Sequence, residues 1–354
     1  MEPKILGTGA NGFTGHYFVR YLAERNIPVR AMYYGPDGRP NDLVHDCVDL
    51  VPGDVRDRKQ IRAALEGIDV VQHVAALYRP TNISQQQYYD VNVDGTVNMV
   101  ELAKEAGVRR FVQCSTIGVH GTAGREPVDE DAPIRPDDYY QESKWLGEKA
   151  AVEKAAELEL PLTVIRPAGI YGPRERRFLK IAQLVHRRRF LMFGDGTTLY
   201  HFIHVRDLCD AFMLAAESEA AVGNRYIIAD DHAISIDTFV GLLARSSGVK
   251  PPRLHIPFAL LQCAAVLCEG VCKPLGLSPP IHRRRAAWFK SNRCFDISRA
   301  RKDLGYEPSV SIEAGVADMV RSYFEAGWLP ENGRSRPALE TLPLVPDDAC
   351  AAAD

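Results

Sequence analysis

Residues 7–15 read Gly7-Thr8-Gly9-Ala10-Asn11-Gly12-Phe13-Thr14-Gly15, and this stretch decides the fold. It follows the short apolar run at 4–6, which predicts a strand, and it opens into residues 13–25, which predict a helix. Glycine permits a tight turn, a close approach of a pyrophosphate to the backbone, and close packing of the helix on the strand. Free N–H groups at the start of the helix then face the phosphate charge. The stretch therefore predicts a dinucleotide-binding strand–loop–helix unit.

Two glycine spacings overlap in this loop, and the sequence leaves both open. Gly7, Gly9 and Gly12 fit GxGxxG, whereas Gly9, Gly12 and Gly15 fit GxxGxxG. The choice of dinucleotide is also open. An acidic residue after the second strand would bind the ribose hydroxyls of NAD, and an arginine would suit the 2′-phosphate of NADP. Here the strand ends in Tyr33-Tyr34, with Asp37 and Arg39 a little further on. The cofactor is NAD or NADP, and the missing acid favours NADP.

The first half of the chain alternates apolar runs with helical patterns, which is typical of an α/β protein. The predicted strands are 4–6, 28–33, 48–51, 69–74, 110–114 and 161–166, and the predicted helices are 13–25, 58–65, 88–106 and about 137–158. This order predicts a Rossmann, doubly wound parallel sheet with a smaller mixed C-terminal substrate lobe. We expect a dinucleotide-binding domain at 1–173, rejoined by some later segments, a mainly substrate-binding lobe at 174–330, and a disordered tail at 331–354.

Composition restricts the possible partners. The chain has 354 residues, 46% of them apolar and 25% charged, with a net charge of -3. This is typical of a soluble globular protein, and it calls for no nucleic acid or anionic membrane. The eight cysteines form no CxxC pair, so we expect no metal site and a reduced, cytoplasmic location. Residues 256–272 are too few to span a membrane. They fit a helix over the substrate pocket better than a helix on a membrane surface.

Tyr140 and Lys144 form the candidate acid–base pair. They are four residues apart in a predicted helix, so both project from one face. A phenol has an ordinary pKa of about 10 and exchanges protons poorly at neutral pH. A neighbouring ammonium stabilises the phenolate and lowers that pKa. Tyr139 has Ser143 at the same spacing instead of a lysine. The alternative is an ordinary surface Tyr and Lys on an amphipathic helix.

Ser115 and Thr116 directly follow the predicted strand 110–114. Residues just beyond the carboxyl ends of strands line the ligand crevice of a doubly wound sheet. A hydroxyl there can bind a substrate oxygen and hold it near Tyr140, so we take Thr116 as the partner of the pair. The alternative is a turn formed by the two hydroxyl residues.

Together these features resemble the extended short-chain dehydrogenase/reductase superfamily of the NAD-dependent epimerase/dehydratase type, including its 3β-hydroxysteroid dehydrogenase and dihydroflavonol reductase branches. The resemblance covers roughly residues 4–328 and rests on 8–15, 53–57, 72–76, 92–96, 114–116, 166–173 and 300–308. Its implied catalytic residues are Asn92, Thr116, Tyr140 and Lys144. Its implied cofactor-binding residues are Gly9, Asn11, Gly12, Phe13, Thr14, Gly15, Asp54, Val55, Ala75, Ala76, Lys144 and Pro167.

The departures from the family pattern bear on the reaction. Family 4,6-dehydratases carry Asp-Glu directly after the catalytic Thr, and here Ile117-Gly118 follow it, so dehydration is not expected. Many nucleotide-sugar members carry Arg-Asp before a Phe, and that Arg grips a diphosphate. Here Tyr200-His201 precede Phe202. The candidate substrate contacts are Ser115, Tyr200, His201 and Arg283, although the basic run that includes Arg283 is also typical of a solvated turn.

Two enzymatic functions therefore remain in view. The first is an NAD(P)-dependent oxidoreductase that interconverts a secondary alcohol and a ketone, with apolar residues at 258–272 and 288–289 favouring a lipophilic small-molecule substrate. The second is a nucleotide-sugar epimerase with tightly bound NAD. A dinucleotide sensor or scaffold is a third possibility, but it would need no proton donor. The resemblance also implies a homodimer formed through the helices at 88–106 and 140–158.

Overall fold

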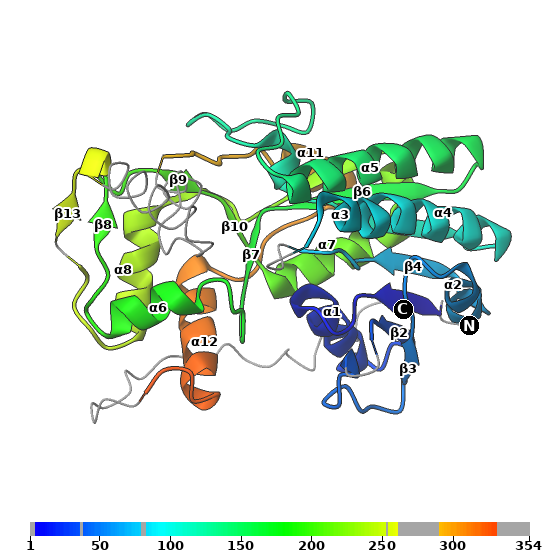
Figure 1. The fold of residues 1–354 in the computed structure, drawn as a ribbon, viewed down its shortest axis with the longest axis horizontal. Coiled ribbons are helices and arrows are strands. Elements are labelled where there is room, and N and C mark those ends of the chain that lie inside the picture. Colours follow the sequence, from blue (N-terminus) through cyan, green and yellow to red (C-terminus); the bar gives the residue numbers. More distant parts are fainter. Residues whose placement is uncertain (1–3, 36–37, 79–82, 253, 261–289, 331–354) are drawn as a thin grey trace, which may run out of the picture. The chain divides into compact units, whose positions relative to one another are not determined.

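The computed structural model describes residues 4–35, 38–78, 83–252, 254–260 and 290–330 (Figure 1). Its centre is a seven-stranded sheet in the order β11-β6-β5-β4-β1-β2-β3, with every neighbouring pair parallel. The strands are β1 (Ile5–Thr8), β2 (Val29–Tyr33), β3 (Val48–Pro52), β4 (Val70–His73), β5 (Arg110–Cys114), β6 (Leu162–Pro167) and β11 (Arg225–Ile228). The prediction of a Rossmann-type parallel sheet is confirmed.

Helices cover both faces of this sheet because its strands carry apolar side chains on both sides. Helices α1 (Phe13–Ala23) and α7 (Val205–Glu217) pack in one apolar cluster, and Figure 1 shows them together. Helices α2 (Arg58–Leu65), α4 (Gly95–Glu105) and α5 (Tyr139–Glu157) pack in the other. Strands β1 and β4 are buried along their whole length, as this two-sided covering requires.

The predicted single helix at 88–106 is divided in the structure. Helix α3 (Gln85–Tyr89) starts earlier, because Ser84 and Gln87 form a reciprocal capping box at its N-terminus. A π-helical turn, Asp90–Asp94, then leads into α4. A π turn carries one more residue per turn than an α-helix and often marks a functional position. The continuous-helix prediction was therefore wrong in its boundaries and its regularity.

The chain divides into two compact units. The first contains residues 1–170, 199–233 and 291–309, and the second contains residues 171–198, 234–290 and 310–354. Besides the sheet and its helices, the first holds β9 (Leu199–Tyr200), β10 (Phe202–His204), α11 (Ser298–Leu304) and short 3₁₀ turns at Ile117–His120 and Glu219–Ala221. The second holds α6 (Leu179–His186), β8 (Met192–Phe193), β12 (Ile234–Ser235), α8 (Ile236–Ser246), β13 (His255–Ile256) and α12 (Ile312–Glu325). Strand β7 (Gly169–Tyr171) lies at the division.

Several sequence predictions concern residues outside the described part. The tail at 331–354, most of the apolar stretch at 256–272 and Arg283 belong to this group. Among the helices that the structure does describe, none has the combined length and hydropathy that crossing a lipid bilayer requires.

The glycine loop between β1 and α1 decides between the two overlapping glycine spacings. Gly9 has a φ of +76°, which L side chains rarely adopt, and a Cβ on it would lie 3.0 Å from the Cα of Ala75. A Cβ on Gly15 would overlap the carbonyl oxygen of Gly9. A Cβ on Gly7 would only reach an ordinary contact of 3.6 Å with Val19. The geometry therefore requires the spacing that ends at Gly15.

We predict that Gly15→Ala destabilises the protein by about 1–3 kcal/mol, because the methyl group pushes α1 away from the loop. Denaturant unfolding followed by circular dichroism measures this change. Gly241→Ala is the matched control, since Gly241 also lies inside a helix but its nearest outside neighbour is the end of the Arg245 side chain, at 3.8 Å. That change should stabilise the protein slightly. Equal effects of the two substitutions would contradict the steric explanation.

Candidate active site

The carboxyl ends of β1 and β4 meet at the point where the strand order reverses, which is where doubly wound sheets bind their ligands. The Thr8 hydroxyl joins the two ends by accepting the backbone N–H groups of Val74 and Ala75, each at 3.0 Å. Gly9 faces Ala75 across this junction. The predicted cofactor residues Gly9, Ala75 and Ala76 thus belong to neighbouring loops.

The N-terminus of α1 provides a place for a phosphate. Gly12 is the N-cap residue, and no side chain caps the helix. The first-turn N–H groups, which include those of Phe13 and Thr14, therefore have no side-chain acceptor, and the helix dipole favours an anion beside them. A Cβ on Gly15 would fill the turn that leads to them. These features fit the pyrophosphate of a dinucleotide.

Asn11 fixes the loop that follows β2. Its Nδ2 donates to the carbonyl oxygen of Tyr34 at 2.9 Å, and its Oδ1 accepts the Tyr34 N–H at 3.4 Å. Asn11 therefore holds the glycine loop against the position where an adenosine ribose would be recognised. These two hydrogen bonds explain why an asparagine occupies this position of the loop, which the glycine pattern alone does not explain.

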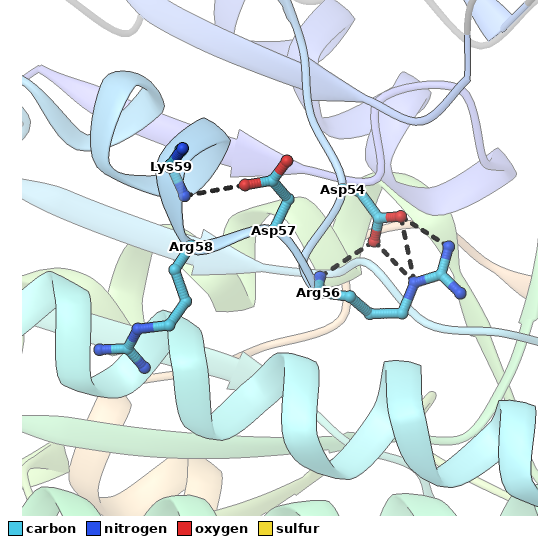
Figure 2. A pocket seen from close by; sticks show the side chains of 5 residues that line it. All are labelled: Asp54, Arg56, Asp57, Arg58 and Lys59. Carbon is cyan, nitrogen blue, oxygen red and sulfur yellow. Dashed lines mark hydrogen bonds and ion pairs between the residues drawn. The ribbon is translucent and has the colours of Figure 1, made fainter.

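Figure 2 shows a pocket formed by the segment between β3 and α2. Asp54, the predicted adenine contact, accepts three hydrogen bonds of 2.6, 3.0 and 3.1 Å from the Arg56 guanidinium. Partial burial opposes ionisation of Asp54, but the hydrogen bonds from Arg56 prevail and lower the pKa of its carboxyl. Arg56 also donates to the Tyr34 hydroxyl at 3.2 Å. Sequence reasoning did not assign Arg56 a role, although a basic residue so close to Asp54 was a usable signal.

The side chains of Asp57 and Arg58, which also line this pocket, have structural partners. Asp57 caps α2 by accepting the N–H group of Lys59, as Figure 2 shows, and that of Gln60. Arg58 pairs with Glu101 of α4 at 2.6 Å. The Arg56–Asp54 pair is therefore the part of the pocket that faces the end of β2, through Tyr34.

Lys144 lies at the carboxyl end of β5. Its side chain is 2% exposed, and its Nζ donates to the carbonyl oxygen of Cys114 at 2.7 Å. Burial lowers the pKa of this ammonium, and the negative charge of Glu148 opposes that effect. An ammonium has three donors, so within the described part of the chain two remain for ligands.

Thr116 follows Cys114 by two residues and caps the 3₁₀ turn that begins at Ile117. Its Oγ1 accepts the Gly118 N–H at 3.0 Å. A hydroxyl that accepts one hydrogen bond still has a proton to donate. A Cβ on Gly118 would lie 3.2 Å from Thr116 Oγ1 and 3.1 Å from Cγ of Gln141. The turn that carries Thr116 therefore packs on the first turn of α5, beside Tyr140.

Tyr140 is half-buried, and its ring meets the Tyr78 ring edge-to-face, with centroids 4.8 Å apart. Tyr78 belongs to the loop after β4. The neighbouring Tyr139 is 55% exposed. The structure thus turns Tyr140, and not Tyr139, toward the loop that carries Ala75 and Ala76.

Asn92 lies in the π turn and links this loop to α5. Its Oδ1 accepts the Leu77 N–H at 2.7 Å, and its Nδ2 donates to the Ser143 hydroxyl at 2.9 Å. Ser143 in turn donates to the Tyr140 carbonyl oxygen at 2.9 Å. A Cβ on Gly147 would overlap the Asn92 carbonyl oxygen, so α5 approaches the π turn closely. Asn92 therefore links the loop after β4, through Ser143, to the backbone of Tyr140.

A buried chain of hydrogen bonds runs from the glycine loop to Asn92. Thr8 already accepts two backbone N–H groups, so it donates to Nδ1 of His73, 3.1 Å away. His73 Nε2 then carries the proton and donates to Thr96 at 3.2 Å, and Thr96 donates to the Asn92 carbonyl oxygen at 2.9 Å. Burial, helped by the charge of Lys144, lowers the pKa of His73 to about 3. His73 thus stays neutral, and this order of donors persists at physiological pH.

Ser115, the residue before Thr116, contacts a buried ion pair that the sequence analysis did not predict. Glu148 and Arg166 are at most 1% exposed and are joined by hydrogen bonds of 2.6 and 3.1 Å. Ser115 donates to Glu148 at 2.7 Å, and His120 contacts Arg166 at 3.0 Å. The hydroxyl of Ser115, proposed from sequence as a substrate contact, is thus directed to this ion pair.

The remaining predicted residues have different positions. Pro167 is the last residue of β6 and is buried. Tyr200 packs on Phe202, with ring centroids 4.8 Å apart. His201 is 1% exposed, and its nitrogens meet the Asp230 carbonyl oxygen at 2.7 Å and the Phe295 N–H at 3.3 Å. Burial lowers the pKa of His201 to about 4. A substrate contact by His201 is therefore disfavoured, and the position is that of a core histidine.

The parallel strand order and the glycine loop between β1 and α1 define a dinucleotide-binding enzyme of the Rossmann class. The model of the NAD dependent epimerase/dehydratase family matches residues 5–229, and the chain belongs to that family. Within the described residues, no group of three or more His, Cys, Asp or Glu is arranged to hold a metal ion.

Similar proteins narrow the reaction class. The chain is 31% identical to the 3beta-hydroxysteroid-dehydrogenase/decarboxylase isoform 1 of Arabidopsis thaliana, over 91% of this chain and 80% of that protein. It is 30% identical to the sterol demethylase protein B of Methylococcus capsulatus, over 92% of this chain and 99% of that protein. The crystal structure of gox2253 superimposes with a TM-score of 0.79 at 26% identity, covering 93% of this chain and 100% of that chain. The protein is an NAD(P)-dependent oxidoreductase of the extended short-chain dehydrogenase/reductase type, and the nucleotide-sugar epimerase alternative fits these relatives less well.

We predict that Glu148→Gln destabilises the protein by about 3–5 kcal/mol, because it leaves the Arg166 charge buried without its carboxylate. Denaturant unfolding measures the change. Glu153→Gln is the control on the same helix, since the Glu153 side chain is 66% exposed and forms a surface ion pair with Lys149. A loss no larger than that of the control would show that the buried pair does not stabilise the fold.

Proposed function

We propose that the enzyme interconverts a secondary alcohol and a ketone by hydride transfer at a site formed by Tyr140, Lys144 and Thr116. The observation that carries the proposal is the bond from Lys144 to the Cys114 carbonyl oxygen. This bond holds the Lys144 ammonium at the end of β5, where Thr116 follows two residues after Cys114. Lys144 lies on the same helix as Tyr140. When bound, the nicotinamide supplies the hydride donor or acceptor.

Each residue has a distinct role in this proposal. Tyr140 exchanges the proton of the substrate oxygen, and the positive charge of Lys144 favours the phenolate form that accepts this proton. Thr116 donates a hydrogen bond to the same oxygen, because its hydroxyl keeps a proton after capping the 3₁₀ turn. Asn92 positions Tyr140 through Ser143. No metal is needed for these steps.

We further propose a sterol-like substrate, a fused apolar ring system that carries the reacting hydroxyl group. The names of the Arabidopsis and Methylococcus relatives support this class. So does the absence of the diphosphate-gripping arginine, since Tyr200 stands at that place and packs on Phe202. Ser115, Tyr200 and Arg283 remain proposed substrate contacts, although Ser115 already bonds to Glu148.

We predict that Tyr140→Phe lowers kcat for a 3-hydroxysterol by about 10²–10⁴-fold, because the proton can no longer be exchanged with a positioned group. The dinucleotide Kd should change little. Tyr139→Phe is the matched control, because Tyr139 is exposed and has no lysine four residues later. Near-normal turnover by Tyr140→Phe would overturn the mechanism. Turnover of nucleotide-sugars with retained NAD would instead support the epimerase.

We propose that the preferred cofactor is NADP. Two features support this choice: no acidic residue follows β2, and Arg56 reaches Tyr34 at that strand end. The pairing of Arg56 with Asp54 partly offsets its charge. The proposed cofactor contacts are Gly9, Asn11, Gly12, Phe13, Thr14, Gly15, Asp54, Val55, Ala75, Ala76, Lys144 and Pro167.

We predict that Arg56→Gln raises the Kd of NADP about tenfold or more while changing that of NAD little, because only NADP presents a 2′-phosphate to the guanidinium. Titration of the purified protein with each dinucleotide measures both constants. Arg62→Gln is the control, since Arg62 is exposed and pairs with Glu105. Tighter binding of NAD by the unaltered protein would refute the preference, whatever the variant does.

The remaining expectations are also retained as proposals. The enzyme is proposed to be cytoplasmic and to form a homodimer through α4 and α5. The 38% exposure of Leu146 on α5 is compatible with such an interface. Residues 1–173, with returning segments, are proposed to hold the cofactor, and residues 174–330 to form most of the substrate lobe.

A further inference from the structure

The small net charge of the chain conceals a strongly basic segment. Residues 174–189 contain seven Lys or Arg and a single acidic residue, Glu175. Glu175 is buried and already pairs with Arg177 at 2.8 Å. The segment runs through α6 and ends in the exposed run Arg187-Arg188-Arg189. Acidic residues of the segment itself therefore neutralise little of its positive charge.

The three terminal arginines differ from the other exposed arginines of the chain. Arg20, Arg62 and Arg109 have side chains 55–66% exposed, and each forms an ion pair with a carboxylate. Within the part of the chain that the structure describes, the run 187–189 forms no ion pair. A cation at the C-terminus of a helix interacts favourably with the helix dipole, but this interaction falls off within the last turn. It does not explain three consecutive arginines.

Exposed leucines lie beside these arginines. Leu191 is 41% exposed and Leu254 is 61% exposed. Strands β8 and β13 lie side by side (Figure 1) and pair in parallel with Met192 opposite His255. The two leucines that precede these residues in the chain are therefore neighbours. Lys250 is exposed a few residues before Leu254. The three arginines directly follow α6. We therefore call the surface formed by Arg187, Arg188, Arg189, Leu191 and Leu254 the α6 face.

We propose that the α6 face docks on the surface of a lipid bilayer that carries anionic headgroups. Arginines bind phosphate and carboxylate headgroups, while short apolar side chains beside them enter the headgroup–acyl boundary. A nucleic acid would explain the arginines, but it offers no apolar region to bury the leucines. The combination of unpaired cations and neighbouring exposed leucines therefore favours a lipid surface.

Such docking gives a peripheral association that salt weakens. Charge attraction to an anionic leaflet falls off within a Debye length, so binding by the arginines should weaken steeply as salt rises. The leucine contribution is not screened and should persist. This proposal concerns where the enzyme binds, and it does not depend on the identity of its substrate.

The test is co-sedimentation of the full-length protein with vesicles made of phosphatidylserine and phosphatidylcholine in equal parts. Vesicles of phosphatidylcholine alone are the comparison. We expect strong binding to the mixed vesicles and much weaker binding to phosphatidylcholine alone, with high salt weakening the binding to the mixed vesicles. The variant Arg187→Gln/Arg188→Gln/Arg189→Gln should lower the partition coefficient on the order of 100-fold, from about fivefold for each arginine. Leu191→Ser/Leu254→Ser should lower it at every salt concentration.

The matched control is Arg20→Gln/Arg62→Gln/Arg109→Gln, which changes the net charge equally but removes paired arginines. It should sediment like the unaltered protein. An equal loss in this control would show that net charge alone governs binding and would overturn the proposal. Loss of binding to a polyanion such as single-stranded RNA in the arginine variant, with the leucine variant binding vesicles normally, would also overturn it. The assay contains no substrate, so its failure leaves the proposed reaction untouched.

Discussion

The buried ammonium of Lys144 is the constraint on which the site depends. A charge that is 2% exposed must be stabilised by its surroundings, and the Cys114 carbonyl oxygen at the end of β5 supplies the nearest acceptor. Glu148, one turn further along α5, adds a negative charge that is itself held by Arg166. These contacts fix the orientation of α5 and its position along the sheet. Tyr140 is thereby placed beside the loop after β4.

The same region shows how polar groups in a protein interior can order one another. The chain from Thr8 through His73 and Thr96 to Asn92 gives every member a donor and an acceptor role. Because His73 stays uncharged, the chain can be buried without the cost of isolating an ion. It connects the cofactor loop to the residue that positions Tyr140, so the two halves of the proposed site share one rigid polar core.

Local sequence patterns predicted much of the fold. Helix α2 and strand β5 have the predicted bounds, because Asp57 caps the helix and a run rich in apolar residues forms the strand. The π turn was missed because one extra residue hardly disturbs a helical pattern, and the bonds that Asn92 forms there, to Leu77 and Ser143, join separate segments. The pair Glu148–Arg166 and the Arg56–Tyr34 contact were missed because they join separate elements. Glycine spacing alone left two possibilities, and only the overlap at Gly15 decided between them.

The long sequence separation of these bonds has a consequence for the folding of the enzyme. Thr8 and His73 are 65 residues apart, Asn92 and Ser143 are 51 apart, and Cys114 and Lys144 are 30 apart. Contacts between distant segments form slowly, since the chain must first close the loops between them. Helical structure can therefore appear well before Lys144 reaches Cys114 and Asn92 reaches Ser143, so completion of the proposed site marks the end of folding and not its beginning.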